Sequence, residues 1–389
     1  MLAKASLATA CSRVGLTWPL AGPGLADVLA GAAGALGLDD AQATASQARL
    51  SLPAAERVVV VMVDGLGRNN LAERSGHARF MSQLLPGSTA LNSTFPSTTA
   101  TALGTLGTSA PPGVTGMLGY TVRNPATGAL ANLVSWTDLP EADRWQRQPT
   151  WFERLLAAGI GVRSVGPHRF AGSGLTEAVL RGGLYLPAET LAQRVDRALP
   201  AAKEPGLVYL YWGEVDKTGH HDGPGSLAWG DELAATDKEL ARLARSLPRG
   251  TLMVITADHG MVEVDHTARW DVATSPQLSH GVALVTGEPR AMQLHVHPGT
   301  DPEAVATRWR DALGDHGVVI TKDEALAAGL FGPVEPHVLP VVGDVVVAMA
   351  GCATVVDSHT QTAASLQLVG VHGSLTEQET AIPLLVTVA

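Results

Sequence analysis

The uninterrupted apolar run at residues 58–63, Val-Val-Val-Val-Met-Val, constrains the fold of this chain more than any other segment. Alternating polarity predicts a strand with one solvated face, whereas an unbroken β-branched run predicts a strand buried on both faces, as in a parallel sheet. The run ends at Asp64, and a carboxylate there is costly unless a cation or strong hydrogen-bond donors meet it. We therefore expect the centre of an α/β sheet, with a candidate site at the strand's end.

Strands and helices are expected to alternate on either side of this run. The patterns predict strands at 162–165, 207–212 and 251–256 and helices at 70–85, 97–106, 151–158 and 227–247. Such alternation predicts an α/β fold, a doubly wound and mostly parallel sheet sandwiched by helices. After residue 261 the pattern changes to a strand at 292–297, a helix at 301–313 and a strand at 318–321. This change predicts a small inserted α+β lobe.

These patterns divide the chain into three parts. We expect an N-terminal extension that packs on the core over 1–55, a main α/β domain over 56–284 and 346–389, and an inserted β-α-β lobe over 285–345. A chain of 389 residues exceeds what one simple core usually holds, which agrees with a large domain and a smaller lobe.

Charge and hydropathy limit the partners and the location. The formal net charge is −10, from 27 Lys and Arg against 37 Asp and Glu, which argues against a nucleic-acid polymer as partner. A small phosphorylated substrate stays compatible, because bound cations reverse the local field. Residues 1–20 lack an unbroken apolar segment typical of a signal peptide, and no apolar run of about 18 residues follows. We expect a cytoplasmic protein without a membrane partner; its oligomeric state stays open.

Aspartate and histidine residues follow several of the expected strand ends. Each motif alone is weak, because a strand-terminal Asp often caps a helix and Asp/His pairs four residues apart occur by chance. Carboxylate and imidazole are ligands that zinc favours, and two ions about 4 Å apart can clamp the attacking and leaving oxygens of a phosphoryl transfer. Together the motifs predict a site for two divalent cations, Zn²⁺ or alternatively Mn²⁺, formed by Asp64, Asp216, His220, Asp258, His259 and His372.

A hydroxyl-rich loop follows the strand expected at 88–92. A threonine hydroxyl is a poor nucleophile until a metal ion lowers its pKa. From Thr94-Phe95-Pro96 alone, a helix cap is the simpler interpretation of Thr94. The register of the loop decides which hydroxyl faces the ions, because the loop also carries Ser93, Ser97, Thr98 and Thr99.

The ordered set of motifs resembles the alkaline phosphatase superfamily, specifically its nucleotide pyrophosphatase/phosphodiesterase branch. The motifs are Asp64 after its strand, Thr94-Phe95-Pro96, Asp216-x-x-x-His220, Asp258-His259 and His372-Gly373, and the last is also similar to phosphonoacetate hydrolases. The resemblance implies that Thr94 is the nucleophile and binds one zinc ion together with Asp64, Asp258 and His259. It implies a second ion on Asp216, His220 and His372, and hydrolysis of a small phosphorylated substrate such as a nucleotide through a phosphothreonine intermediate.

One position departs from the pattern of that branch. The branch has an Asn after the nucleophile that helps to hold the phosphoryl oxygen, whereas Met117 stands near that place and a thioether donates no hydrogen bond. The candidates for a replacement donor are Asn92, Thr115 and Tyr120. His280, which also precedes a glycine, is the rival of His372 as metal ligand and otherwise a substrate-side or structural histidine.

Alternatives remain at the level of activity. A phosphomonoesterase or a phosphonate C–P hydrolase would use the same metal ions. A monoesterase needs added positive charge, for which the candidates are Arg68, Arg123, Arg169 and Arg181. A catalytically silent metal-binding protein is a further alternative. A dinucleotide-dependent oxidoreductase is disfavoured, because residues 64–67 lack the G-x-G-x-x-G spacing.

Overall fold

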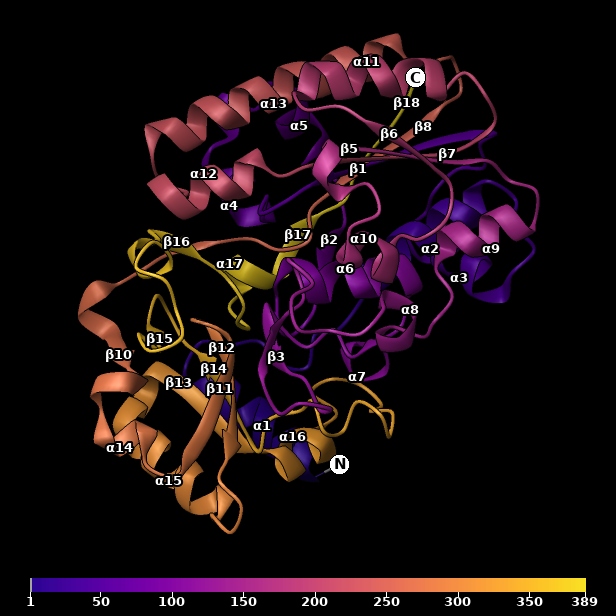
Figure 1. Ribbon diagram of the computed structural model, residues 1–389. Helices are drawn as coiled ribbons and strands as arrows, with labels where there is room; N and C mark the ends of the chain where they lie inside the picture. The colour runs from indigo at the N-terminus through magenta and orange to yellow at the C-terminus, as the bar shows by residue number, and fades with distance from the viewer. Residues whose placement is uncertain (1) are drawn as a thin grey trace.

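The computed structural model describes residues 2–389 and contains a six-stranded main sheet near its centre (Figure 1). In sheet order its strands are β18 (Leu385–Val388), β8 (Leu252–Thr256), β1 (Arg57–Val63), β7 (Gly206–Trp212), β5 (Val162–Gly166) and β6 (Leu184–Pro187). The neighbours from β8 to β6 pair in parallel, and only β18 is antiparallel to its neighbour. The expected mostly parallel sheet is therefore present.

The apolar run forms the middle strand of this sheet. In β1, Val60 pairs with Tyr209 on one side and Val254 on the other, and residues 58–63 are fully buried. Burial on both faces explains why the sequence shows no polar alternation there. The strands β8, β1 and β7 are neighbours, so their carboxyl ends meet at one edge of the sheet.

Helices cover both faces of the main sheet, as Figure 1 shows. One layer contains α5 (Arg79–Leu84), α11 (Leu191–Ala201), α12 (Glu214–Asp222) and α13 (Leu227–Ser246). The other contains α2 (Ala26–Ala35), α3 (Ala41–Arg49), α6 (Thr99–Thr108), α9 (Trp151–Ala157) and α10 (Gly174–Val179). Shorter helices are α4 (Arg68–Glu73), α7 (Pro112–Thr115), α8 (Ala142–Trp145) and α17 (Glu377–Thr380). The result is a three-layer α/β sandwich.

A second, antiparallel sheet lies beside the main domain. Its strands, in order, are β13 (Gly317–Thr321), β14 (Val345–Met349), β12 (Ala291–Val296), β11 (Val282–Glu288), β3 (Thr121–Arg123) and β4 (Leu130–Asn132). The helices of this region are α14 (Pro276–Ser279), α15 (Pro302–Leu313) and α16 (Lys322–Ala328). The lobe boundary of 285–345 stays a prediction. The second sheet also includes β3, β4, residues 282–284 and residues 346–349, which lie outside that range.

Three short strand pairs complete the fold. They are β2 (Ala90–Asn92) with β17 (Ala381–Pro383), β9 (Val262–Glu263) with β16 (Gly370–Val371), and β10 (Arg269–Asp271) with β15 (Thr354–Val356). The strand expected near residue 90 thus pairs with β17 instead of joining the main sheet. The helix expected over 70–85 is divided into α4 and α5 around a 3₁₀ turn at 75–77, where Gly76 weakens the helix.

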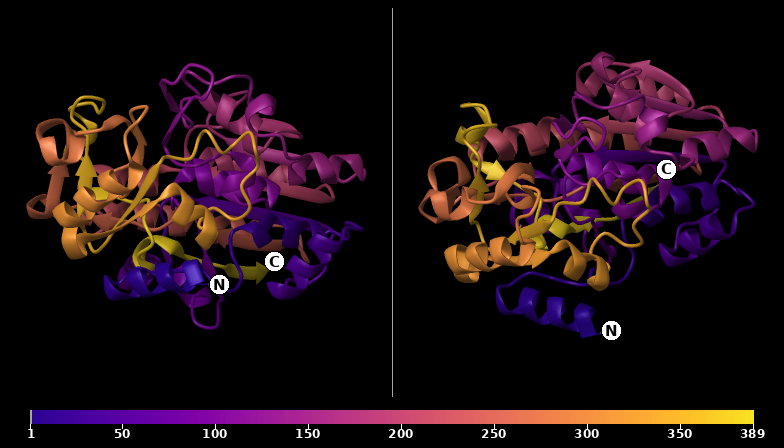
Figure 2. Two further views of the ribbon diagram at one scale, coloured as in Figure 1. Left: turned by 90° about the horizontal axis from the view of Figure 1, so that it is seen from below. Right: turned by 60° about the horizontal axis from the view of Figure 1, so that its bottom comes forward.

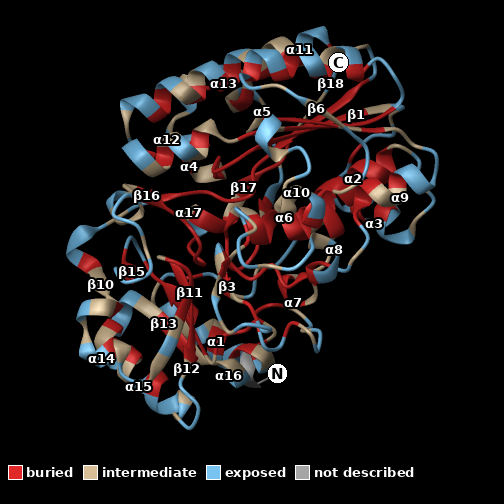
Figure 3. Ribbon diagram, in the orientation of Figure 1, coloured by how far each residue is buried: buried red, intermediate tan, exposed pale blue. Residues whose placement is uncertain are grey.

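The N-terminal residues contact both regions. Helix α2 is buried from residue 27 to 35 against α6 and β1, so it is part of the core. Helix α1 (Leu2–Arg13) lies on the outside and packs against α16 (Figure 2). Figure 3 shows the buried residues concentrated in the strands of both sheets and in α2 and α6. Within residues 2–389, no helix is both long and apolar enough to cross a membrane.

Candidate active site

The predicted metal ligands converge at the carboxyl edge of the three central strands. Asp64 follows β1, and Asp258 and His259 follow β8. Helix α12, which follows β7, carries Asp216 and His220 one turn apart, and β16 leads directly into His372. The structure groups these side chains into two triads, Asp64 with Asp258 and His259, and Asp216 with His220 and His372.

The ligand atoms within each triad lie close together. His259 Nε2 is 3.4 Å from Asp64 Oδ1 and 3.5 Å from Asp258 Oδ2. Asp216 Oδ2 is 3.4 Å from His220 Nε2, and its Oδ1 is 3.8 Å from His372 Nε2. The rings of His259 and His372 stack with centroids 3.5 Å apart, so the two triads are adjacent. This spacing suits two cations in one cleft.

The hydrogen bonds around the triads leave the inner ligand atoms free. Among the described residues, Asp64 Oδ1, Asp216 Oδ1 and Asp258 Oδ2 are buried without a hydrogen-bond partner. Each histidine directs Nδ1 to a backbone carbonyl oxygen, at 2.7 Å to Gly370 for His220, 3.1 Å to Gly260 for His259 and 2.9 Å to Ser97 for His372. Such bonds orient an imidazole so that Nε2 can bind a metal. The donor set therefore fits two divalent cations.

Burial shifts the pKa of one residue in each triad, Asp64 and His372, in the direction expected for a site completed by cations. Burial raises the pKa of Asp64 well above its usual value, and the nearby carboxylates of Asp258 and Asp216 raise it further. Burial lowers the pKa of His372 well below its usual value, which keeps its ring neutral and its lone pair available. Divalent cations offset the carboxylate repulsion that otherwise opposes this arrangement.

Gly65 allows α12 to approach the end of β1 closely. Its φ of 72° lies in the left-handed region, and a Cβ there would lie 2.8 Å from Asp216 Cβ. Its N–H donates to Asp258 Oδ1 over 3.0 Å, which leaves Oδ2 facing the cleft. A glycine after Asp64 is thus required both by the backbone conformation and by the close approach of α12.

The structure places Thr99, and not Thr94, beside the first triad. The Thr94 hydroxyl donates to the carbonyl oxygen of Pro96 over 2.7 Å. The Thr99 hydroxyl lies 3.2 Å from His259 Nε2, the nitrogen that faces Asp64 and Asp258. Thr99 is also the first residue of α6, and a helix N-terminus favours an anionic group. Three further hydroxyl residues, Ser93, Ser97 and Thr98, lie in the same loop, so only the three-dimensional structure separates these candidates.

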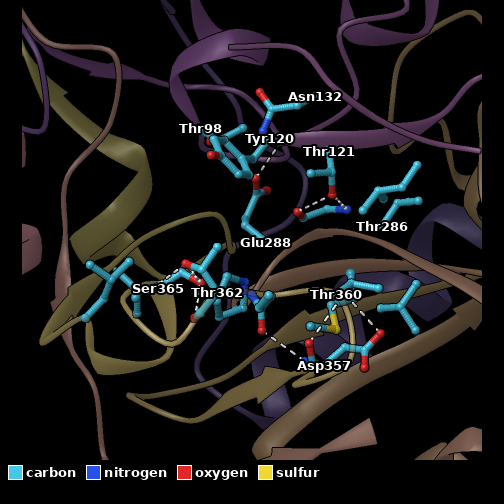
Figure 4. Close-up of a pocket in the computed structure, with 18 of the residues that line it drawn as sticks. Thr98, Tyr120, Thr121, Asn132, Thr286, Glu288, Asp357, Thr360, Thr362 and Ser365 are labelled. Carbon is cyan, nitrogen blue, oxygen red and sulfur yellow. Dashed lines mark hydrogen bonds between the residues drawn. The ribbon is translucent and has the colours of Figure 1, made fainter. Parts of the chain in front are cut away.

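Two cavities open from the candidate metal site formed by the two triads. The lobe cavity, about 610 Å³, is bounded by β3, β4, β11 and the loop 357–368 (Figure 4). The sheet cavity, about 540 Å³, lies over the ends of β5, β6 and β7 and over α12. Both are lined by Thr98, Tyr120, His220 and His372. Thr99 lines the sheet cavity, whereas Thr94 lines neither.

The predicted substrate residues are mostly outside these cavities. Asn92 donates to the carbonyl of Ala21, and Thr115 is fully buried, so both act in local structure. His280 is exposed beside α15 and lines neither cavity. Tyr120 alone of the four lines both cavities.

Met117 packs in the core instead of facing the site. It is fully buried, and a Cβ on Gly104 of α6 would lie 2.8 Å from Met117 Cγ. It therefore does not occupy the place expected for a phosphoryl-binding amide. Of the four candidate arginines, only Arg169 lines a cavity, the sheet cavity.

Two polar residues of the site escaped the sequence prediction. The Tyr211 hydroxyl donates to Asp64 Oδ2, which holds that carboxylate in place. Glu288 lines the lobe cavity, and burial raises its pKa to about 8. Tyr211 lies inside a strand that the sequence predicted, but its apolar surroundings gave no sign of a polar role. Glu288 belongs to no recognisable sequence motif, so only the structure shows that it lies at the site.

Comparison with known proteins identifies the family. Residues 58–375 match the family described as type I phosphodiesterase / nucleotide pyrophosphatase. The chain belongs to this family. The matched range contains all seven predicted metal ligands, Thr94 among them, and the family supports a hydrolase.

Individual relatives agree with this assignment. Human ectonucleotide pyrophosphatase/phosphodiesterase family member 5 is 32% identical over 130 residues, which cover 28% of this chain and 27% of that protein. A solved structure of inactive murine ectonucleotide pyrophosphatase/phosphodiesterase 5 in complex with AMP has TM-score 0.65 and 18% identity, covering 85% of this chain and 87% of the other. Phosphonoacetate hydrolase from Sinorhizobium meliloti 1021, in complex with phosphonoformate, has TM-score 0.67 and 20% identity, covering 86% and 90%. The two solved structures share the alkaline phosphatase-like fold.

Proposed function

We propose that this protein is a two-metal phosphodiesterase or nucleotide pyrophosphatase that acts through a covalent phosphothreonine intermediate. The observation that carries the proposal is the pairing of two triads, each with an unpartnered carboxylate oxygen, beside the Thr99 hydroxyl. The match of residues 58–375 to the family supports a hydrolase acting on phosphorus esters or anhydrides. The murine relative bound to AMP supports a small nucleotide-like substrate.

The residues that would hold the two ions are those of the triads. One ion would bind Asp64, Asp258 and His259, and the other Asp216, His220 and His372. Oxygen and imidazole ligands favour Zn²⁺, and Mn²⁺ would also suit this mixed set. When bound, two such ions would lower the pKa of the attacking hydroxyl or water and would neutralise charge on the phosphoryl oxygens.

We propose Thr99 as the nucleophile in place of Thr94. Its hydroxyl oxygen would attack phosphorus, the alcohol group would leave, and water would then hydrolyse the phosphothreonine. The N-terminus of α6 would direct its free N–H groups toward the phosphoryl oxygens. Tyr120, on the rim of both cavities, is the candidate for a further contact with the phosphoryl group.

The matched variants Thr99→Ala and Thr94→Ala test this assignment. With bis-p-nitrophenyl phosphate as substrate, Thr99→Ala is expected to lower kcat at least about 1000-fold, because it removes the group that forms the covalent bond. Thr94→Ala is expected to keep kcat within about tenfold, because it removes a hydrogen bond to Pro96 away from the cavities. Both variants should keep two metal ions.

The reverse pattern, with Thr94→Ala inactive and Thr99→Ala active, would return the nucleophile to Thr94. Activity in both variants would contradict the covalent mechanism. Absence of diester turnover from metal-loaded wild type would favour a catalytically silent protein.

A phosphonate C–P hydrolase is the second candidate. The segment His372-Gly373-Ser374-Leu375-Thr376-Glu377 and the shared fold with phosphonoacetate hydrolase favour it. A phosphomonoesterase is less well supported, because Arg169 is the only one of the four candidate arginines in a cavity. Parallel assays with bis-p-nitrophenyl phosphate, p-nitrophenyl phosphate and phosphonoacetate separate the three activities.

A further inference from the structure

The two cavities differ in charge. Among the residues that line the lobe cavity there is no Lys or Arg, and two carboxyl groups, Glu288 and Asp357, are present. The sheet cavity includes three cations, Arg169, Arg194 and Lys217, beside the carboxyl groups of Asp64, Glu214 and Asp216. The aromatic rings of Phe170 and Tyr211 also pack there with centroids 5.6 Å apart. A diester has two substituents on phosphorus, and each cavity begins at the candidate metal site. The cavities are therefore suited to different substituents.

The carboxyl group of Glu288 is incompletely paired. The residue is only 6% exposed, and Oε2 accepts the N–H of Tyr120 over 2.8 Å (Figure 4). The Thr98 hydroxyl is a further donor to this carboxyl group. Its Oε1 has no hydrogen-bond partner within residues 2–389. A buried carboxyl oxygen without a partner is costly, and a hydrogen-bond donor on a ligand would remove that cost. Asp357 differs, because Thr360 and the backbone of His359 already bond to it.

Apart from Glu288 and Asp357, the wall combines apolar side chains such as Leu130, Val285 and Met292 with uncharged hydroxyl and amide groups. Figure 4 shows the hydroxyl groups of Thr360, Thr362 and Ser365 on one side of the cavity and Thr121 with Asn132 on the other. Such groups bind alcohols and amines and offer no compensation for a second anion. A carboxylate or an additional phosphate in this cavity would face Glu288 without a cation.

We infer that the lobe cavity receives the alcohol substituent of a phosphodiester that carries an amino or hydroxyl donor and no negative charge, with Glu288 as its acceptor. The inference rests on the proposed phosphodiesterase function and adds which substituents the site accepts. The second substituent then lies in the sheet cavity beside Phe170 and Tyr211. Glu288 thereby determines specificity from the second sheet, through the last residue of β11.

Three matched diesters of p-nitrophenyl phosphate test the inference. They carry 2-aminoethyl, 2-hydroxyethyl or carboxymethyl as the second substituent and share one aromatic group, which is expected in the sheet cavity. With metal-loaded wild type at pH 9, kcat/KM is expected to fall from amino to hydroxy to carboxy. The kcat/KM values of the amino and carboxy diesters should differ by at least about tenfold. The Glu288 carboxylate attracts the ammonium group and repels the carboxylate group.

The variant Glu288→Gln supplies the control. It keeps an acceptor for Tyr120 and removes the charge, so the amino and carboxy diesters should differ by no more than about threefold. Arg169→Gln, in the other cavity, should change all three diesters by the same factor. Two results would overturn this inference and leave the proposed function standing. One is equal turnover of the three diesters by wild type, and the other is a ratio of kcat/KM between the amino and carboxy diesters that Glu288→Gln leaves unchanged. No turnover of any diester contradicts the proposed function as well.

Discussion

Glu288 carries an ionisable carboxyl that is almost fully buried in the wall of the lobe cavity. Burial is the largest cause that raises its pKa to about 8, and the hydrogen bonds from the N–H of Tyr120 and the hydroxyl of Thr98 offset this only in part. Asp64 shows the same effect more strongly, because Asp258 and Asp216 lie beside it. The structure keeps these costly groups in a cleft, which is typical of a functional site.

Glu288 makes the stability of the protein depend on pH. Its carboxyl is protonated in the folded protein up to pH 8, whereas in the unfolded chain it ionises near its ordinary pKa of 4.5. The folded state therefore binds the extra proton between these values, and stability falls as pH rises through this window. Relative to Glu288→Gln, wild type should lose roughly 4 kcal/mol of unfolding free energy between pH 5 and pH 9. Urea unfolding of both proteins across that range measures this difference. Unfolding free energies of wild type and Glu288→Gln that change with pH in the same way would contradict the burial of a titrating carboxyl.

At the scale of elements, the site depends on how closely α12 approaches the end of β1. The loop after β1 turns at Gly65, and α12 brings Asp216 within reach because no side chain stands between them. The order β8-β1-β7 then places Asp258, Asp64 and the start of α12, which carries Asp216, side by side. The sheet order is thus the physical origin of the cluster.

Gly65→Ala should weaken metal binding at both triads. Alanine adds a Cβ that lies 2.8 Å from Asp216 Cβ and must adopt a φ of 72°. The backbone strain alone costs about 1 kcal/mol, and the displacement of α12 should lower metal affinity at least about tenfold. Gly37→Ala is the matched control, since Gly37 has a φ of 82° and open space around its Cβ position. Competition with a chelating dye measures the affinity; equal losses in both variants would contradict the proposed role of the close approach.

The sequence predicted elements where burial on both faces determines the pattern. Residues 58–63, 207–212 and 251–256 are long apolar runs, and the structure has strands at all three. Strands β3 and β4 are three residues each, too short for a periodic signal, so their pairing beside β11 was missed. The choice between Thr94 and Thr99 also needed the structure, because adjacent hydroxyls differ only in the direction that the loop gives them.

At the scale of the whole molecule, a buried ion pair joins the second sheet to α17 beside the candidate metal site. Arg290, between β11 and β12, donates to both carboxylate oxygens of Glu379 at 3.0 and 2.7 Å, and both side chains are fully buried. Glu379 also accepts the N–H of Ser374, and its backbone oxygen accepts the N–H of Gly260. The pair therefore fixes the segment after His372 against the segment after His259.

Glu379→Ala should lower both stability and metal binding. The variant leaves Arg290 buried without its partner, which costs about 3–5 kcal/mol, and it releases the segment that carries His372. Glu303→Ala is the matched control, because it removes the exposed pair with Arg310 and should cost less than about 1 kcal/mol. Denaturant unfolding and metal titration measure the two effects. A loss of stability with unchanged metal affinity would reduce the ion pair to a purely structural role.

The metal content of the purified chain tests the two-ion site most directly. After chelation and reloading with Zn²⁺, wild type should bind two ions per chain. Each triad offers three ligand residues, and at least one carboxylate oxygen in each triad has no hydrogen-bond partner. His259→Ala and His372→Ala should each reduce the content to about one tightly bound ion, since each removes one ligand from a different triad. A wild type that binds no divalent ion, or variants that keep both ions at unchanged affinity, would contradict the account.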